Sequence, residues 1–110
     1  MEIKRGDVVV CVFSREHGKP RPGVVVQSDL FNAQHPSLTL CPITTTQRGA
    51  PLFRLSIAPS SANGLRKRSQ IAVDKMSAVK VARVPAVIGR LSDAEMEAVN
   101  AALMLWLNLE

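Results

Sequence analysis

The feature that most limits the possible folds is the shortness of the apolar runs, which are rich in β-branched residues and bounded by turn residues. Residues 8–13 (Val-Val-Val-Cys-Val-Phe) are a clear example, and the turn Gly6-Asp7 precedes them. A run of this length suits a strand and is too short for an average helix. We expect further strands over residues 24–27, 38–43, 52–57, 71–74 and 85–91, while residues 76–84 are ambiguous.

The C-terminal segment differs, because its pattern has the period of a helix. Ser92 and Glu95 have the spacing of a capping box, and Asp93 lies near the positive end of the helix dipole. The apolar residues that follow recur at spacings of three and four: Met96, Val99, Ala102, Leu103, Trp106 and Leu107. Met and Trp in such a stripe are usually core residues, and we expect one face of this helix to pack on the sheet or on a partner.

Five or six short strands followed by one amphipathic helix predict a mainly β fold, a small antiparallel barrel with a helical lid. The 110 residues predict one domain spanning residues 1–110. The apolar runs fall far short of the roughly 20 residues needed to cross a membrane. The N-terminal residues have no apolar segment typical of a secretory signal, so we expect a cytoplasmic protein without membrane contact.

The two cysteines do not have the spacing of a metal site. Cys11 and Cys41 lie inside apolar strand patterns, with no CxxC motif and no histidine close in sequence. Buried free thiols are therefore expected, in preference to a disulfide or a zinc site. Nothing in the sequence predicts a metal or another cofactor.

The charge is distributed unevenly along the chain. Residues 1–91 contain all 14 Lys and Arg and five Asp or Glu, giving 14 − 5 = +9, whereas residues 92–110 contain four acids and no base, giving −4. A basic body of this kind favours a polyanion through long-range attraction and counterion release. Charge alone fits an ordinary solvated surface equally well. The triplet Arg66-Lys67-Arg68 also fits an ordinary solvated surface, and we interpret it as a solvated loop tip.

A candidate site lies between residues 19 and 47. Arg21 opens the second predicted strand, and the cluster Thr44-Thr45-Thr46 leaves the third. A guanidinium presents a fixed fork of donors that matches phosphate oxygens, and hydroxyls add further donors. This pairing predicts a phosphate-binding cleft, provided that Arg21 and Thr44 face the same side of the fold.

Several short motifs, in order along nearly the whole chain, carry a family resemblance. They are Arg5-Gly6-Asp7, Arg21-Pro22, Val26-Gln27-Ser28-Asp29, Pro42-Ile43-Thr44, Val73-Asp74-Lys75 and Ile88-Gly89-Arg90-Leu91-Ser92-Asp93. In order and spacing the chain resembles the MazF/PemK family of type II toxins, which are endoribonucleases.

That resemblance implies an SH3-like barrel of the MazF/CcdB type, a homodimer, and metal-independent cleavage of single-stranded RNA. It also implies a cognate antitoxin with an acidic or amphipathic tail that covers the basic groove. Arg21 matches the family's catalytic Arg, and Thr44 matches its phosphate-contacting Thr. Asp74 falls where some members have an acidic residue assigned as the base.

Metal-free RNA cleavage needs a base for the 2′-OH, a cation for the phosphorane and an acid for the leaving oxygen. A guanidinium does not release its proton near neutral pH, so we assign Arg21 charge stabilisation. Thr44 would donate a hydrogen bond to the same phosphate. His17 and Asp74 are the candidates for proton transfer, and His35 is a more distant one. An exposed loop histidine and a strand-end salt bridge are the alternative readings of His17 and Asp74.

The expected RNA contacts beyond this group are polar or basic, because the chain has few aromatic residues for base stacking. Binding through phosphates should therefore weaken steeply with salt. The expected RNA-binding residues are Lys19, Thr45, Thr46, Gln47, Arg48 and Lys75.

Two other functions remain open at this stage. The same fold resembles toxins of the CcdB type, which poison DNA gyrase as binding proteins through C-terminal residues that include a Trp. Trp106 lies near this C-terminus, although its place in the helical stripe argues for burial. The other alternative is a catalytically inactive module that binds RNA or sequesters an antitoxin.

Overall fold

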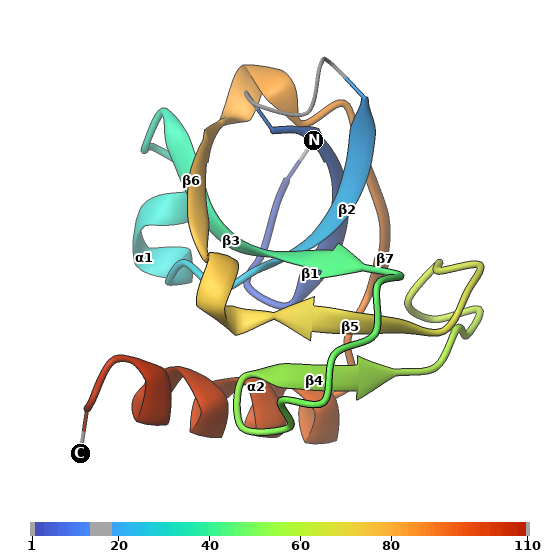
Figure 1. Cartoon of the computed structure of the whole chain (residues 1–110). Helices are drawn as coiled ribbons and strands as arrows, with labels where there is room; N and C mark the ends of the chain where they lie inside the picture. The colour runs from blue at the N-terminus through green and yellow to red at the C-terminus, as the bar shows by residue number, and fades with distance from the viewer. Residues whose placement is uncertain (1, 14–18, 110) are drawn as a thin grey trace.

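The computed structural model describes residues 2–13 and 19–109, which form short strands, two α-helices and two 3₁₀ turns (Figure 1). The elements in chain order are β1 (Asp7–Val12), β2 (Pro20–Val25), α1 (Asp29–Asn32), β3 (Ser37–Thr44), β4 (Arg54–Ile57), β5 (Ser69–Ala72), η1 (Val73–Lys75), β6 (Ser77–Lys80), η2 (Val81–Arg83), β7 (Ala86–Arg90) and α2 (Asp93–Trp106).

The described strands form one seven-stranded antiparallel sheet in the order β4-β5-β3-β2-β1-β7, with β6 paired to β3 outside this path. The long strand β3 connects the two halves of the sheet, because it pairs with β6 and β2 along its first part and with β5 at its end. The sheet curls on itself, as Figure 1 shows. The predicted mainly β, barrel-like fold with a C-terminal helix is confirmed.

Apolar side chains fill both faces of the curled sheet. The neighbours Val8 and Val9 are fully buried in two different clusters, one beside α2 and one inside the curl. Burial on both faces explains why the strands read as continuous apolar runs. Cys11 and Cys41 are free and buried, as predicted, and burial raises the pKa of each thiol to about 12.

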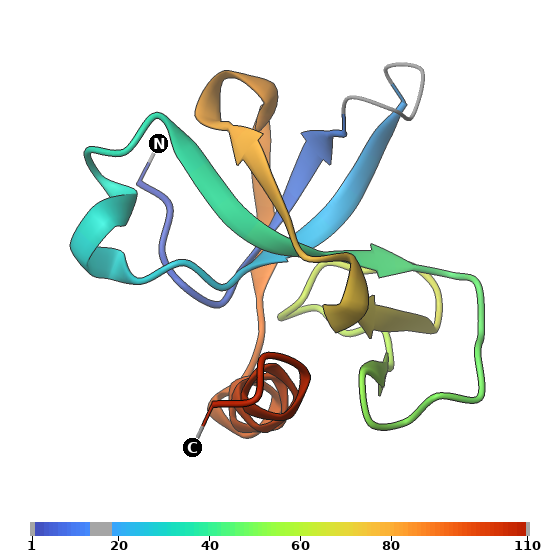
Figure 2. The ribbon, with the colours of Figure 1, turned by 60° about the vertical axis from the view of Figure 1, so that its left-hand side comes forward.

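The helix α2 begins with the predicted capping box. The Ser92 hydroxyl accepts from the Glu95 backbone N–H (3.1 Å), and the Glu95 carboxylate accepts from the Ser92 N–H (2.8 Å). The helix packs beneath the sheet at the end opposite η2 (Figures 1 and 2), through Val99 and Ala102. The expectation that Trp106 is a core residue of this chain is wrong, because its side chain is 47% exposed and its ring lies tilted against that of Phe53, with the ring centroids 5.1 Å apart.

The motif Arg5-Gly6-Asp7 joins the N-terminus to the rest of the fold. The Arg5 guanidinium donates to the Val26 carbonyl (2.8 Å) and to the Asn100 side chain (2.6 Å) on α2. The buried Asp7 carboxylate binds Arg90 of β7 at 2.9 Å. The polar residues of this motif therefore hold the two ends of the chain together.

Some predicted boundaries are wrong for local reasons. Strand β2 begins at Pro20, four residues before the predicted start, because its polar and proline-containing part pairs with β1. The predicted strand over residues 71–74 ends at Ala72, so Asp74 lies in the 3₁₀ turn η1. The ambiguous residues 76–84 divide into β6 and η2. None of the described helices is long and apolar enough to cross a membrane.

Candidate functional site

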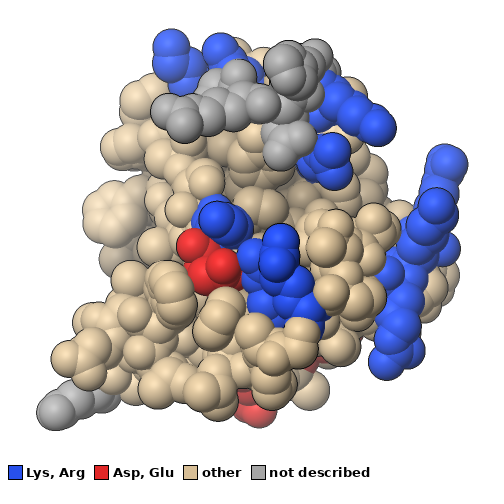
Figure 3. Space-filling model, in the orientation of Figure 1, with Lys and Arg blue, Asp and Glu red and all other residues tan. Residues whose placement is uncertain are grey.

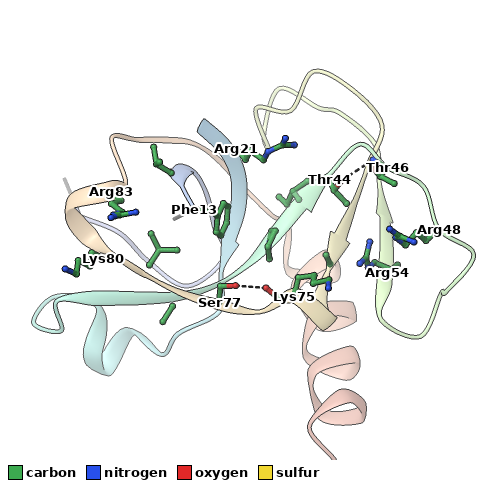
Figure 4. Close-up of a pocket in the computed structure, with 16 residues that line it drawn as sticks. Phe13, Arg21, Thr44, Thr46, Arg48, Arg54, Lys75, Ser77, Lys80 and Arg83 are labelled. Carbon is green, nitrogen blue, oxygen red and sulfur yellow. Dashed lines mark hydrogen bonds between the residues drawn. The ribbon is translucent and has the colours of Figure 1, made fainter. Parts of the chain in front are cut away.

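A cleft of about 910 Å³ opens along β3, and basic side chains surround it (Figure 4). Its other lining groups are apolar side chains and the hydroxyls of Thr44, Thr46 and Ser77. No Asp or Glu of the described residues lines it, and its cations are distributed along its length: Arg21, Arg48, Arg54, Lys75, Lys80 and Arg83. In the orientation of Figure 1, Lys and Arg gather along the top and in the middle of the molecular surface (Figure 3).

Arg21 and Thr44 both line this cleft, from neighbouring strands. Gly23 of β2 pairs with Pro42 of β3, and Arg21 and Thr44 each lie two residues further toward the same end of the pair. Side chains alternate along strands, so this spacing places both on one face of the sheet. The Cys11 thiol also donates to the Arg21 carbonyl at 3.6 Å. The structure thus brings together the two residues on which the sequence argument depends.

The loop after β3 is held by hydrogen bonds. The Thr44 hydroxyl accepts from the Thr46 backbone N–H at 3.1 Å. Gln70, the β5 residue that pairs with Thr44, accepts from the Arg48 N–H (3.1 Å) and donates to the Arg48 carbonyl (3.0 Å). Gln70 is 5% exposed, so these bonds fix the Arg48 backbone from inside the fold. This role of Gln70 was not predicted from the sequence.

Arg54 is a lining residue that the sequence analysis missed. Its guanidinium makes two bonds with Asp74, Nε to Oδ1 at 2.6 Å and Nη2 to Oδ2 at 3.0 Å. Arg54 is 6% exposed, and Asp74 does not line the cleft. The hydrogen bond from Arg54 holds the pKa of Asp74 below its ordinary value, and the contact raises the pKa of Arg54. Both groups stay charged near neutral pH.

The other end of the cleft is formed by β6 and η2. Lys80 and Arg83 are exposed there, and Phe13 lies between them and Arg21 in Figure 4. Lys75 lies nearer the middle, where its carbonyl accepts from the Ser77 hydroxyl at 2.8 Å. Lys80 and Arg83 were not predicted, because they belong to the segment whose pattern was ambiguous. Their basic character was the only signal available.

The remaining predicted residues divide into three groups. Thr46, Arg48 and Lys75 line the cleft, whereas Lys19, Thr45 and Gln47 do not. His17 lies outside the described residues. His35 lines a separate cavity of about 670 Å³, where its Nδ1 contacts Ser37. Within the described residues, no three His, Cys, Asp or Glu side chains form a group that could hold a metal ion.

This arrangement is suited to an anionic, extended ligand. The cations of the cleft attract phosphates, and Arg21 and Thr44 line it with donors of the kind that bind a phosphate. The described lining offers charge stabilisation and hydrogen-bond donors but no carboxylate. Its chemistry is therefore that of phosphate binding and stabilisation of developing negative charge.

Comparison with known proteins gives one consistent family. Residues 4–107 match the family described as "PemK-like, MazF-like toxin of type II toxin-antitoxin system". The chain is 34% identical over 108 residues to the "Probable endoribonuclease MazF" of Mycolicibacterium smegmatis, covering 97% of this chain and 98% of that protein. It is 29% identical over 113 residues to "Endoribonuclease EndoA" of Bacillus subtilis, covering 99% and 97%.

Solved structures agree in fold. An endoribonuclease in complex with its cognate antitoxin, from Mycobacterial species, superposes with a TM-score of 0.83 at 22% identity, covering 98% of this chain and 97% of that one. A crystal structure of MazF from Deinococcus radiodurans gives a TM-score of 0.81 at 19% identity and covers 98% of each chain. These two likenesses establish the curled sheet with its C-terminal helix.

Proposed function

The chain belongs to the PemK-like, MazF-like toxin family of type II toxin–antitoxin systems, and from that premise we propose that it is an endoribonuclease that cleaves single-stranded RNA. The observation that carries this proposal is the presence of Arg21 and Thr44 in one basic cleft. A cleft lined by cations and hydroxyls suits a phosphodiester backbone. The names of the curated relatives favour this function over that of a gyrase poison.

In the proposed reaction the ribose 2′-oxygen attacks the adjacent phosphorus. The 2′-OH gives its proton to a base as the P–O2′ bond forms, and an acid protonates the 5′-oxygen as the P–O5′ bond breaks, so the products are a 2′,3′-cyclic phosphate and a 5′-hydroxyl. Negative charge grows on the two non-bridging oxygens of the phosphorane. Arg21 lies on a paired strand and Thr44 at the end of the neighbouring one, so the backbone that carries both donors is in place before the charge develops.

Arg54 would add a second fixed positive charge near this phosphate. Its two bonds to Asp74 hold its guanidinium in one orientation at the cleft wall. We therefore assign Asp74 a positioning role rather than that of the base. A carboxylate whose pKa is lowered by a guanidinium attracts protons weakly, which disfavours it as a base. His17 remains a predicted candidate for proton transfer.

The partners follow from the same premise. The solved relatives include an endoribonuclease in complex with its cognate antitoxin and a MazE–MazF structure from Deinococcus radiodurans. We propose that an antitoxin with acidic residues covers the basic cleft of this chain. We also propose a homodimer and a cytoplasmic location, where its RNA substrate would be found. Several apolar side chains near α2 are exposed and offer a surface for protein contact: Leu52, Leu105, Trp106, Leu107 and Leu109.

The test of the proposed function is to incubate the protein with a long RNA in EDTA, and to map the product ends by primer extension and end-labelling. Cyclic phosphates and 5′-hydroxyls at defined sites are expected. A requirement for Mg²⁺, or 5′-phosphate ends, would argue against the mechanism. Arg21→Ala separates this reading from the gyrase alternative, because it should abolish RNA cleavage, whereas a gyrase poison would keep its toxicity.

A further inference from the structure

The loop between β4 and β5 carries a cluster of cations that the cleft does not include. Arg66, Lys67 and Arg68 are consecutive and exposed. Among the described residues none of the three side chains forms an ion pair or a hydrogen bond, and none lines the cleft. Three adjacent positive charges without a partner repel one another, so an anionic ligand would relieve an unfavourable arrangement.

The loop that presents this triplet is anchored to the fold. Asn63 is 1% exposed, and its side chain accepts from the Ser60 and Leu65 backbone N–H groups, both at 3.0 Å, and donates to the Ala58 carbonyl at 2.9 Å. Gly64 lies close against β7, because a Cβ atom there would overlap the Ile88 carbonyl oxygen. The charges are therefore carried on a fixed turn.

Sheet register places the triplet beyond the Thr44 end of the cleft. Thr44 pairs with Gln70, and Arg68 lies two residues before Gln70 on the approach to β5. Because β5 runs antiparallel to β3, residues before Gln70 extend in the same direction as those after Thr44. At about 3.3 Å per residue this places Arg68 roughly 7 Å beyond the pair. Figure 3 shows Lys and Arg along the right-hand edge, where Figure 1 places this loop.

We propose that Arg66, Lys67 and Arg68 bind the phosphates of RNA nucleotides that flank the nucleotide being cut. The proposal rests on the proposed ribonuclease function and deepens it. Exposed cations contact phosphates without reading base sequence, so the triplet should strengthen binding of longer RNA without changing the cleavage site. Its effect should appear in KM and in the salt dependence of KM, and not in kcat.

The experiment compares two RNAs with the same cleavage site, one just long enough to be cut and one extended by several nucleotides at both ends. In the triple variant R66S/K67S/R68S the salt slope of log KM for the long RNA should fall by about 2, since each single-strand phosphate contact contributes about 0.7. Cleavage of the short RNA should be unchanged. Lys67→Ser alone should give about a third of the effect.

A matched control is Lys4→Ser, which removes one exposed Lys that lines the separate cavity containing His35. It should leave the cleavage of both RNAs unchanged.

Equal salt slopes for wild type and triple variant on the long RNA would overturn the proposal while leaving the ribonuclease function intact. If the wild type cuts neither RNA, the ribonuclease function fails, and fluorescence anisotropy with the long RNA still tests the triplet. Circular dichroism and the single variant guard against misfolding of the triple variant.

Discussion

The two ends of the cleft differ in how their cations are held. At the Thr44 end, which contains Arg21, Thr44, Thr46, Arg48 and Arg54, Asp74 fixes the Arg54 guanidinium, Gln70 fixes the Arg48 backbone, and the pairing of β2 with β1 fixes the Arg21 backbone. At the Arg83 end, Lys80 and Arg83 are exposed, and among the described residues they form no ion pair or side-chain hydrogen bond.

This difference indicates a division of tasks. Stabilising a transition state needs donors whose positions are set before charge develops, because reorganisation at that moment costs free energy. Attracting a polyanion needs only positive charge, which flexible side chains supply as well. We therefore expect chemistry at the Thr44 end and general electrostatic attraction at the Arg83 end. Substitutions at the two ends should then affect different kinetic constants.

The largest effect should come from Arg21→Ala. Removing the cationic donor to the phosphorane should lower kcat by roughly 10²–10³-fold, with a smaller change in KM. Single-turnover cleavage of a defined RNA measures this directly. Arg83→Ala is the matched control, since it removes the same charge from the other end of the cleft. Similar kcat values for the two variants would contradict the division of tasks.

The next largest effect is expected for Asp74→Asn, because this substitution leaves the buried Arg54 guanidinium without its charged partner. The expected loss of unfolding free energy is about 3 kcal/mol near neutral pH, together with a fall in kcat. Because the pKa of Asp74 is lowered in the folded state from its ordinary value of 3.8, the carboxylate stabilises the fold above that value. This stabilisation is lost as the pH falls through the lowered pKa.

Urea unfolding of wild type and variant, at neutral pH and at pH values below about 4, measures both effects. The difference between the two proteins should shrink on acidification. Asp7→Asn is the control, because Asp7 binds Arg90 away from the cleft and the Arg90 side chain is 54% exposed. It should leave kcat unchanged. A stability difference between wild type and Asp74→Asn that grew as the pH fell would refute the assigned role.

A smaller effect is expected for Gln70→Ala, which removes both side-chain bonds to the Arg48 backbone. The unfolding free energy should fall by about 1–2 kcal/mol. The rate of RNA cleavage should fall by about tenfold, because Arg48, which lines the cleft, is displaced. Gln27→Ala is the control: the Gln27 side chain also bonds to neighbouring backbone, at the Ser37 carbonyl and the Thr39 N–H, away from the cleft. Equal losses of activity in both variants would show that general destabilisation of the fold, and not displacement of Arg48, lowers the rate of cleavage.

The smallest effects belong to Lys80→Ala and Arg83→Ala. Each should leave kcat near that of the wild type and lower the salt slope of log KM by about 0.7, the contribution of one phosphate contact to a single strand. Steady-state kinetics at several salt concentrations provide the slope. A large fall in kcat for either variant would mean that the Arg83 end takes part in the chemistry.

Much of this site could be predicted because the information is local. Arg21 and Thr44 lie near the ends of strands that are neighbours in sequence and in the sheet, so their shared face follows from strand pairing alone. The helix α2 was equally predictable, since its capping box and apolar spacing lie within the helix and its first turn. Such features depend on local sequence patterns or on the pairing of consecutive strands, and little on contacts between distant parts of the chain.

Other features depend on tertiary contacts that no local pattern reveals. Arg54 reads as part of an alternating strand, and only its contact with Asp74, twenty residues away, explains why a buried position carries a charge. The exposure of Trp106 was missed because helical spacing predicts which residues share a face, but not how far the sheet extends over it. The role of Gln70 likewise depends on the register between β3 and β5.

The most direct test of the central claim is a crystal structure of the protein with an RNA that carries a 2′-deoxynucleotide at the mapped cleavage site, which removes the attacking oxygen. We predict that the scissile phosphate lies within hydrogen-bonding distance of both the Arg21 guanidinium and the Thr44 hydroxyl, with the backbone continuing along the cleft toward Lys80 and Arg83. A scissile phosphate seated away from Arg21 and Thr44 would contradict the account.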